Sequence, residues 1–207
     1  MIGRFISLEG GEGVGKSTQI KRLAEALRGR DHDVIETREP GGSPGAEAIR
    51  SLLLEGERDR WTAQSEALLF AAARADHVER LIRPALERGA WVLCDRFVDS
   101  SLAYQGGAGG VGVETVRQLH QAGSGGLLPD RTVLLVLPAN AAAERAAARD
   151  RSAGDRIGGR DSAYHARVAA SFQALADEDP GRFRLIDAAG SAEQVTARLM
   201  AALDDLS

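Results

Sequence analysis

The sequence holds a single cysteine, Cys94, so it cannot form an internal disulfide, and this favours a reducing compartment. It has no excess of positive charge, since its net charge is −4, which argues against a protein that coats nucleic acid or binds an anionic membrane. No run approaches the roughly 18 apolar residues needed to span a bilayer, and the N-terminus has no signal-peptide pattern. These absences predict a cytoplasmic protein with no nucleic-acid or membrane partner.

The chain has 207 residues, enough for one domain with a single core, so we expect one domain over residues 1–207. Apolar strand candidates alternate with helical patterns. The expected strands are Phe5–Leu8, Val34–Thr37, Ala90–Asp95, Thr132–Leu137 and Phe183–Asp187. The expected helices are Lys16–Arg30, Pro44–Leu54, Thr62–Arg88, Val113–Ala122, Asn140–Arg149, Ala163–Asp177 and Ala192–Leu203, with glycine-rich loops at Gly106–Gly112 and Gly123–Gly126. This order predicts an α/β fold, a five-stranded parallel sheet flanked by helices on both faces.

A phosphate-binding loop follows the first expected strand. Residues 10–17 read Gly-Gly-Glu-Gly-Val-Gly-Lys-Ser, which matches G-x-x-x-x-G-K-[ST]. Its glycines let successive backbone N–H groups turn toward an anion, and the helix that follows adds the positive end of its dipole. In this motif Lys16 reaches the β- and γ-phosphates, and the Ser17 hydroxyl can contact Mg²⁺. The predicted nucleoside-triphosphate site comprises Gly10, Gly11, Glu12, Gly13, Val14, Gly15, Lys16, Ser17 and Thr18.

Arginines, an aromatic ring and hydroxyls are expected to gather beside this loop. Ligands of parallel sheets bind at the carboxyl ends of the strands. The second strand runs into Thr37-Arg38-Glu39-Pro40-Gly41-Gly42, and the third runs into a segment from Asp95 to Gly106. On the long helix between them, Phe70 and Arg74 are four residues apart and share a face. An arginine suits a phosphate and a ring suits a nucleobase, so the combination predicts a second nucleotide site.

At these segments the chain resembles the thymidylate kinase (dTMP kinase) family, in its bacterial form. The resemblance rests on the P-loop with Thr18, on Glu39-Pro40-Gly41-Gly42, on Phe70 with Arg74, on Asp95-Arg96-Phe97 and on Ala103-Tyr104-Gln105-Gly106, in the family's order and nearly end to end. It implies a P-loop NTPase fold and ATP-dependent, Mg²⁺-assisted phosphorylation of dTMP to dTDP for dTTP synthesis. It also implies a homodimer, whose interface we expect on the Thr62–Arg88 helix.

The resemblance also implies roles at the phosphate and the sugar. Arg96 would hold the dTMP phosphate, with Arg38 and Glu39 shaping that side of the pocket. Tyr104 would lie against the sugar where a 2′-hydroxyl would project, and Glu12 would face the 3′-hydroxyl. Asp95 and Ser17 are the candidates for Mg²⁺.

Roles at the base follow in the same way. Phe70 would stack on thymine, and Arg74 would donate to a ring carbonyl. Ser101 and Gln105 are placed to bond the edge of the base. Glu9, beside the P-loop, we interpret as structural, forming a hydrogen bond to a neighbouring loop.

An arginine-rich lid is expected at about residues 145–160. A helical pattern there gives way to glycines, so the segment predicts a mobile lid carrying Arg151, Arg156 and Arg160. Phosphoryl transfer needs in-line positioning and positive charge, which makes Lys16, Arg96, Arg151 and Arg156 the predicted catalytic residues. The family often has an acidic residue after Asp-Arg-Ile, whereas Gly158 stands there in this chain. Which lid arginine reaches the transferred group is left open.

Other functions remain as alternatives. One is another (deoxy)nucleotide kinase of the same fold, against which Tyr104 and Gln105 argue. Another is a catalytically weak ATP-binding protein, an interpretation supported by Gly158. A GTPase would need an Asn-Lys-x-Asp segment, but the fourth strand runs into Leu137-Pro138-Ala139-Asn140.

Overall fold

A computed structural model describes residues 3–57, 59–138 and 156–206. Five strands form one parallel sheet in the order β2-β3-β1-β4-β5. They are β1 (Arg4–Glu9), β2 (Val34–Arg38), β3 (Trp91–Asp95), β4 (Arg131–Val136) and β5 (Phe183–Asp187). The expected five-stranded parallel sheet is thus confirmed, and each expected strand lies within two residues of its observed bounds.

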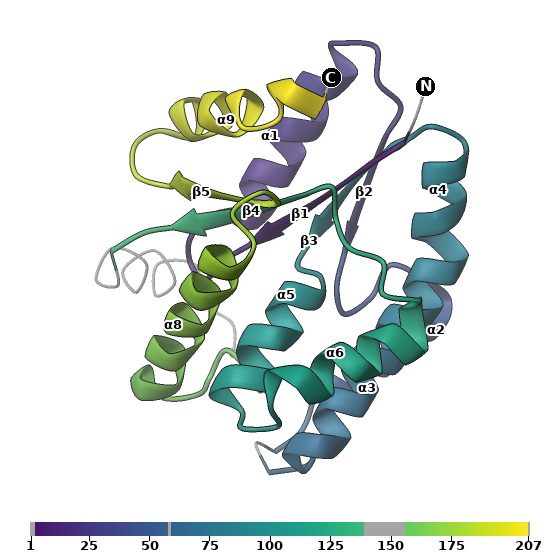
Figure 1. Cartoon of the computed structure of the whole chain (residues 1–207), viewed down its shortest axis with the longest axis vertical. Helices are drawn as coiled ribbons and strands as arrows, with labels where there is room; N and C mark the ends of the chain where they lie inside the picture. The colour runs from purple at the N-terminus through teal and green to yellow at the C-terminus, as the bar shows by residue number, and fades with distance from the viewer. Residues whose placement is uncertain (1–2, 58, 139–155, 207) are drawn as a thin grey trace.

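One face of the sheet is covered by two helices, α1 (Lys16–Arg28) and α9 (Ala192–Ala201), which lie together at the top of Figure 1. Leu23 and Leu27 of α1 and Leu199 of α9 are fully buried in the core on this side. Apolar residues three and four apart on one helix face form such a stripe, and its burial against the sheet stabilises the layer. A short 3₁₀ turn, Asp204–Leu206, ends the described chain.

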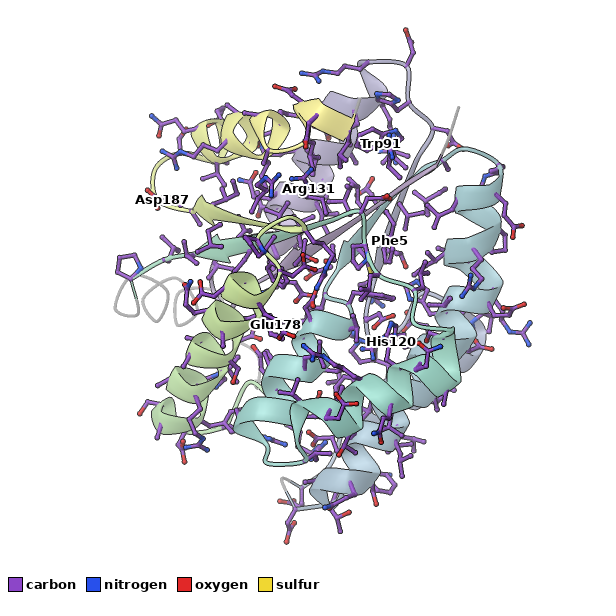
Figure 2. All side chains as sticks on the ribbon, viewed as in Figure 1. Phe5, Trp91, His120, Arg131, Glu178 and Asp187 are labelled. Atoms are coloured by element: carbon purple, nitrogen blue, oxygen red, sulfur yellow. The ribbon has the colours of Figure 1, made fainter. Side chains whose placement is uncertain are left out.

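The other face carries the helices that shape the site (Figure 1). These are α3 (Ala63–His77), α4 (Arg83–Glu87), α5 (Val98–Ser101), α6 (Val113–Ser124) and α8 (Ser162–Glu178), with α2 (Pro44–Leu54) packed on α3. Phe5 of β1, labelled in Figure 2, packs edge to face on Phe97, with 4.7 Å between ring centroids. No helix among the described residues is both long and apolar enough to cross a membrane.

One expectation about helices is wrong, and another is not tested. The expected continuous helix over Thr62–Arg88 changes to π-helical winding at Val78–Ile82 before α4. Pro84 is the second residue of α4; it has no N–H to donate and its ring crowds the preceding turn, which fits the wider winding there. The expected helix Asn140–Arg149 lies outside the described residues.

The predicted loop Gly106–Gly112 was wrong at its start, because Leu102–Ala108 is π-helical. Gly123 likewise lies inside α6 rather than in a loop. A Cβ on Gly107 would come 2.1 Å from the Ser171 hydroxyl of α8. Glycine is therefore used here for close helix packing, which outweighs its poor helix propensity.

Candidate active site

The P-loop joins β1 to α1 at the carboxyl edge of the sheet. Gly10 has φ +131°, and a Cβ there would meet the Leu135 carbonyl oxygen at 2.5 Å, so only glycine fits. Gly15, at φ +95°, precedes α1 without a side-chain cap, and the first turn of α1 holds no acidic residue. The backbone N–H groups of this turn and the helix dipole are therefore available to an anion.

Lys16 lies inside this loop. Its ammonium donates to the carbonyl oxygens of Gly10 at 3.1 Å and Gly11 at 2.7 Å. Burial, helped by the charge of Arg96, lowers the pKa of Lys16 to about 8. A bound anion would favour the charged form, so this site is arranged to bind phosphate.

An oxygen pair stands next to the P-loop. The Ser17 hydroxyl at the start of α1 donates to Oδ2 of Asp95, the last residue of β3, at 3.1 Å. The described parts of the chain contain no cluster of three or more His, Cys, Asp or Glu side chains suited to a metal. A hydroxyl and one carboxylate suit Mg²⁺, which typically takes one or two protein ligands together with phosphates and water.

A pocket of about 90 Å³ opens beside the loop, lined by the segments that follow β2 and β3, by the helices α2, α3 and α5, and by the π-helical segment Leu102–Ala108. Its lining includes the predicted substrate residues Glu12, Glu39, Phe70, Arg74, Arg96, Ser101, Tyr104 and Gln105. Its lining also includes residues to which the sequence analysis assigned no role: Pro40, Arg50, Leu54, Phe97, Ser100 and Ile157. Arg38 does not line it, because its guanidinium turns to Glu47 at 3.2 Å.

Arg96 stands at the boundary between the pocket and the P-loop. It has a left-handed backbone, φ +69°, which is uncommon for a side chain other than glycine. Its guanidinium donates to the Gly10 carbonyl oxygen at 3.0 Å, to the Ser100 hydroxyl at 3.1 Å and to Glu12 at 2.7 Å. It also lies over the Tyr104 ring, 5.1 Å from the centroid. The Arg96 guanidinium can therefore bind a phosphate in the pocket and a phosphate on the P-loop.

Arg74 lies deep in the pocket, and its side chain is 2% exposed. Its Nε donates to Glu39 at 2.7 Å, and its Nη2 donates to the Ser101 hydroxyl at 2.8 Å. The other oxygen of Glu39 lies 3.1 Å from Nδ1 of His77. Glu39, predicted to shape the phosphate side, thus contacts the residue predicted to read the base.

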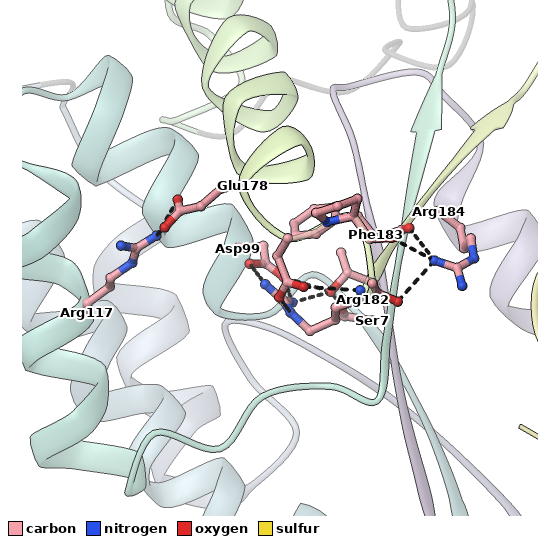
Figure 3. Close-up of polar contacts among 11 residues, drawn as sticks. Ser7, Asp99, Arg117, Glu178, Arg182, Phe183 and Arg184 are labelled. Carbon is pink, nitrogen blue, oxygen red and sulfur yellow. Dashed lines mark hydrogen bonds and ion pairs between the residues drawn. The ribbon is translucent and has the colours of Figure 1, made fainter.

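Glu9 forms the structural contact proposed for it. Its carboxylate accepts from the Phe97 backbone N–H at 2.7 Å and from the Ser100 hydroxyl at 2.6 Å, which confirms that interpretation. Burial, together with the nearby charge of Asp99, raises the pKa of Glu9 to about 8. Figure 3 shows how Asp99 is held in turn, by Arg182 through bonds of 2.6 and 3.0 Å.

Of the three predicted lid arginines, the structure describes Arg156 and Arg160. Arg151 and the rest of 139–155 lie outside the described residues. Arg156 is described, and its buried guanidinium donates to Glu66 of α3 at 2.6 Å. Arg160 donates to the same carboxylate at 2.8 Å. The catalytic roles of Arg151 and Arg156 stay predictions.

Glu66 is the buried site residue that the sequence analysis missed. A signal for it exists, because Glu66, Phe70 and Arg74 follow one another at spacings of four and so share one face of α3. A lone glutamate on a helix is ordinarily solvated, and only its buried partners distinguish this one.

The chain is similar to known proteins over nearly its whole length. A family model described as Thymidylate kinase matches residues 8–199. A thymidylate kinase from Rhizorhabdus wittichii is 65% identical over 206 residues, covering 100% of this chain and 99% of that protein. Another from Caulobacter vibrioides is 51% identical over 197 residues, covering 95% and 94%. A crystal structure of thymidylate kinase from Ehrlichia chaffeensis matches with a TM-score of 0.80 and 28% identity, over 99% of this chain and 100% of that one.

Proposed function

The chain belongs to the thymidylate kinase family and phosphorylates dTMP to dTDP, and we propose how its residues divide that work. One observation carries the assignment. Arg96 bridges the P-loop and the pocket, bonding Gly10 and Glu12 of the loop on one side and Ser100 of α5 on the other. A phosphate in the pocket and a polyphosphate on the loop would therefore meet at one cation.

ATP is the proposed phosphoryl donor, and its phosphates bind at residues 10–18. The open N-terminal turn of α1 supplies backbone N–H donors, and Lys16 supplies a point charge. Since burial lowers the pKa of Lys16 to about 8, the polyphosphate anion would restore its full charge on binding.

Ser17 and Asp95 would hold Mg²⁺, because their oxygens already lie 3.1 Å apart at the loop. The ion would neutralise charge on the phosphates. Asp95 also ends β3 directly before Arg96, so the same strand end would place both the metal ligand and the cation that grips the acceptor.

The acceptor is the phosphate of dTMP, which we place on Arg96. One of its oxygens attacks the γ-phosphorus of ATP in line, the bond to the β-phosphate oxygen breaks, and ADP leaves. No general base is needed, because the attacking oxygen is already an anion. The protein contributes position and positive charge, through Lys16 and Arg96 and, in our proposal, through Arg151 and Arg156 from the 145–160 segment.

The base and the sugar occupy the rest of the pocket. Phe70 stacks on thymine and Arg74 donates to a ring carbonyl, while Ser101 and Gln105 bond the edge of the base. The Tyr104 hydroxyl is buried, and among the described residues it has no hydrogen-bond partner. Tyr104 lines the pocket, and in our proposal its ring lies against the sugar, where it would crowd a ribose 2′-hydroxyl and favour the deoxy sugar.

Glu12 and Arg38 act at the rim. Glu12, held by Arg96 at 2.7 Å, faces the sugar 3′-hydroxyl. Arg38 pairs with Glu47, which also accepts from the Gly42 backbone N–H at 3.0 Å. Arg38 would therefore shape the loop after β2 rather than touch the phosphate.

We further propose one kinase domain over 1–207 that forms a cytoplasmic homodimer. Leu68 on α3 is 55% exposed, which supports an interface on this helix. The net charge of −4 supports the absence of a nucleic-acid partner.

The test is ADP release from ATP and Mg²⁺ with dTMP, dUMP, the ribose form of TMP, dCMP, dGMP and AMP in parallel. We expect fast turnover with dTMP, slower turnover with dUMP and little with the ribose form. Faster turnover with another base would overturn the assignment of Phe70, Arg74 and Gln105. Silence with every acceptor would favour a catalytically weak ATP-binding protein.

A further inference from the structure

Glu66 is a buried carboxylate, 3% exposed, that contacts Gln105 of the pocket lining. It belongs to α3, but its partners come from distant segments. Gln105 Nε2 donates to Oε1 at 3.0 Å, and Arg156 Nη2 donates to Oε2 at 2.6 Å. Arg160 Nη2 donates to both oxygens, at 3.0 and 2.8 Å. A buried carboxylate with this many donors is held in a fixed position, one residue removed from the pocket lining.

The contact with Glu66 determines which way the Gln105 amide faces. A carboxylate can only accept hydrogen bonds, whereas an amide has a donating nitrogen and an accepting oxygen. The NH₂ group of Gln105 must therefore turn to Glu66, since the opposite orientation would bring two acceptors together. Gln105 also lines the pocket, so its carbonyl oxygen is the atom that it can offer to a ligand.

This orientation matches one pattern of base edge. Thymine carries a donor at N3 and an acceptor at O4, while cytosine carries an acceptor at N3 and a donor at N4. A carbonyl oxygen from Gln105 can accept from N3–H of thymine and is repelled by N3 of cytosine. Arg74, which only donates, favours O4 in the same way.

We propose that Glu66 is a positioning residue for base specificity, which holds Gln105 so that its carbonyl oxygen accepts from N3–H of thymine. This inference rests on the proposed role of Gln105 in the dTMP pocket. Glu66 touches no substrate atom, and it acts through the amide that it orients.

The same carboxylate secures the stretch that follows residue 155. Arg156 also donates from Nε to the Leu53 carbonyl oxygen at 2.9 Å, so its side chain is held between α2 and α3. A variant at Glu66 will therefore cost stability as well as specificity, because a buried guanidinium loses its carboxylate. The experiment must separate these two effects.

The readout is the ratio of kcat/KM for dTMP to kcat/KM for dCMP, which a loss of stability alone does not move. Glu66→Gln should lower this ratio about 10-fold, or ~1.4 kcal/mol, because Gln105 is then free to turn its NH₂ group to the base. Glu66→Asp, which keeps the charge for the arginines, should lower it by less and remains measurable if the glutamine variant is unstable.

Two controls sharpen the test. Arg160→Met, which removes another guanidinium partner of Glu66, should lower the melting temperature but leave the ratio unchanged, because the bond between Glu66 and Gln105 remains. Glu79→Gln, at an exposed position on the next helical segment, should leave both unchanged.

The decisive comparison uses Gln105→Ala. If Glu66 acts through the amide, Glu66→Gln will change the ratio in the wild-type background and will change nothing further in the Gln105→Ala background. An unchanged ratio in both Glu66 variants, or the same fall without Gln105, would overturn the inference. A wild-type enzyme that did not prefer dTMP would instead overturn the proposed function of the pocket.

Discussion

The ion pair between Glu39 and Arg74 should be essential to the folded pocket, and replacing either residue alone should be costly. Both side chains are almost fully buried, and Nε of Arg74 lies 2.7 Å from the Glu39 carboxylate. Removing one partner of such a pair costs about 3–5 kcal/mol, because the other charge stays buried without compensation. We expect about 3 kcal/mol from Glu39→Gln, which keeps the shape and an acceptor for Arg74.

Replacing both residues should cost less than the two single losses together. Arg74→Met alone leaves Glu39 buried, with His77 at 3.1 Å, so we again expect about 3 kcal/mol. The double variant Glu39→Gln with Arg74→Met buries no unpaired charge, and its expected loss is about 2–3 kcal/mol. The coupling between the two positions is then about 3 kcal/mol.

The assay is urea unfolding of the four proteins at pH 7, with melting temperatures as a second measure. For a chain of this size about 3 kcal/mol corresponds to ~6–12 °C. If the single losses were to add within about 0.5 kcal/mol, the two charges would not be coupled and the buried pair would be refuted. dTMP should protect the Glu39 variant more than either protein that lacks Arg74, because in the proposed pocket Arg74 donates to the base.

Two further changes test the site. Arg96→Ala should lower kcat/KM for dTMP at least 100-fold, about 2.7 kcal/mol, while ATP affinity stays largely intact. Kinetics in which each substrate is varied in turn measure the first effect, and binding of an ATP analogue measures the second. An equal loss of ATP affinity with dTMP use spared would contradict the two-site assignment. Glu9→Gln should flatten the pH dependence of stability, because the pKa of Glu9 is about 8 in the folded protein against an ordinary 4.5. The folded state keeps this proton where the unfolded state has lost it, so stability should fall as pH rises from about 5 to 8 in the wild type. Urea midpoints of both proteins across that pH range measure the pH dependence of stability. The same pH dependence in the wild type and in Glu9→Gln would count against a buried Glu9 carboxylate with a raised pKa.

Much of this protein could be predicted from local patterns. Apolar runs alternating with helical periods indicate a parallel sheet, because strands joined through helices must run the same way. The P-loop is equally local, since its glycines, Lys16 and Ser17 are neighbours in the chain and their chemistry depends on that spacing. Phe70 and Arg74 could be paired by helical spacing, and the structure does bring both to the lining of one pocket.

The partners of the buried charges could not be predicted in this way. Glu39 was placed beside the phosphate, yet it contacts Arg74, 35 residues away in sequence. Glu66 was overlooked because an isolated glutamate on a helix is ordinarily solvated, and only the approach of Gln105 and Arg156 buries it.

Local patterns were enough to predict the strands, most of the helices, the phosphate-binding loop and the residue types of a nucleotide site, because periodicity and turn chemistry act over a few neighbouring residues. The strand order, the π-helical winding at Leu102–Ala108 and the direction in which each buried polar group faces depend on contacts between distant segments. These depend on which segments pack together across the sheet. The electrostatics of the pocket follow from the same packing, because a buried charge needs an oppositely charged or hydrogen-bonding group nearby, and that group often comes from a distant segment of the chain.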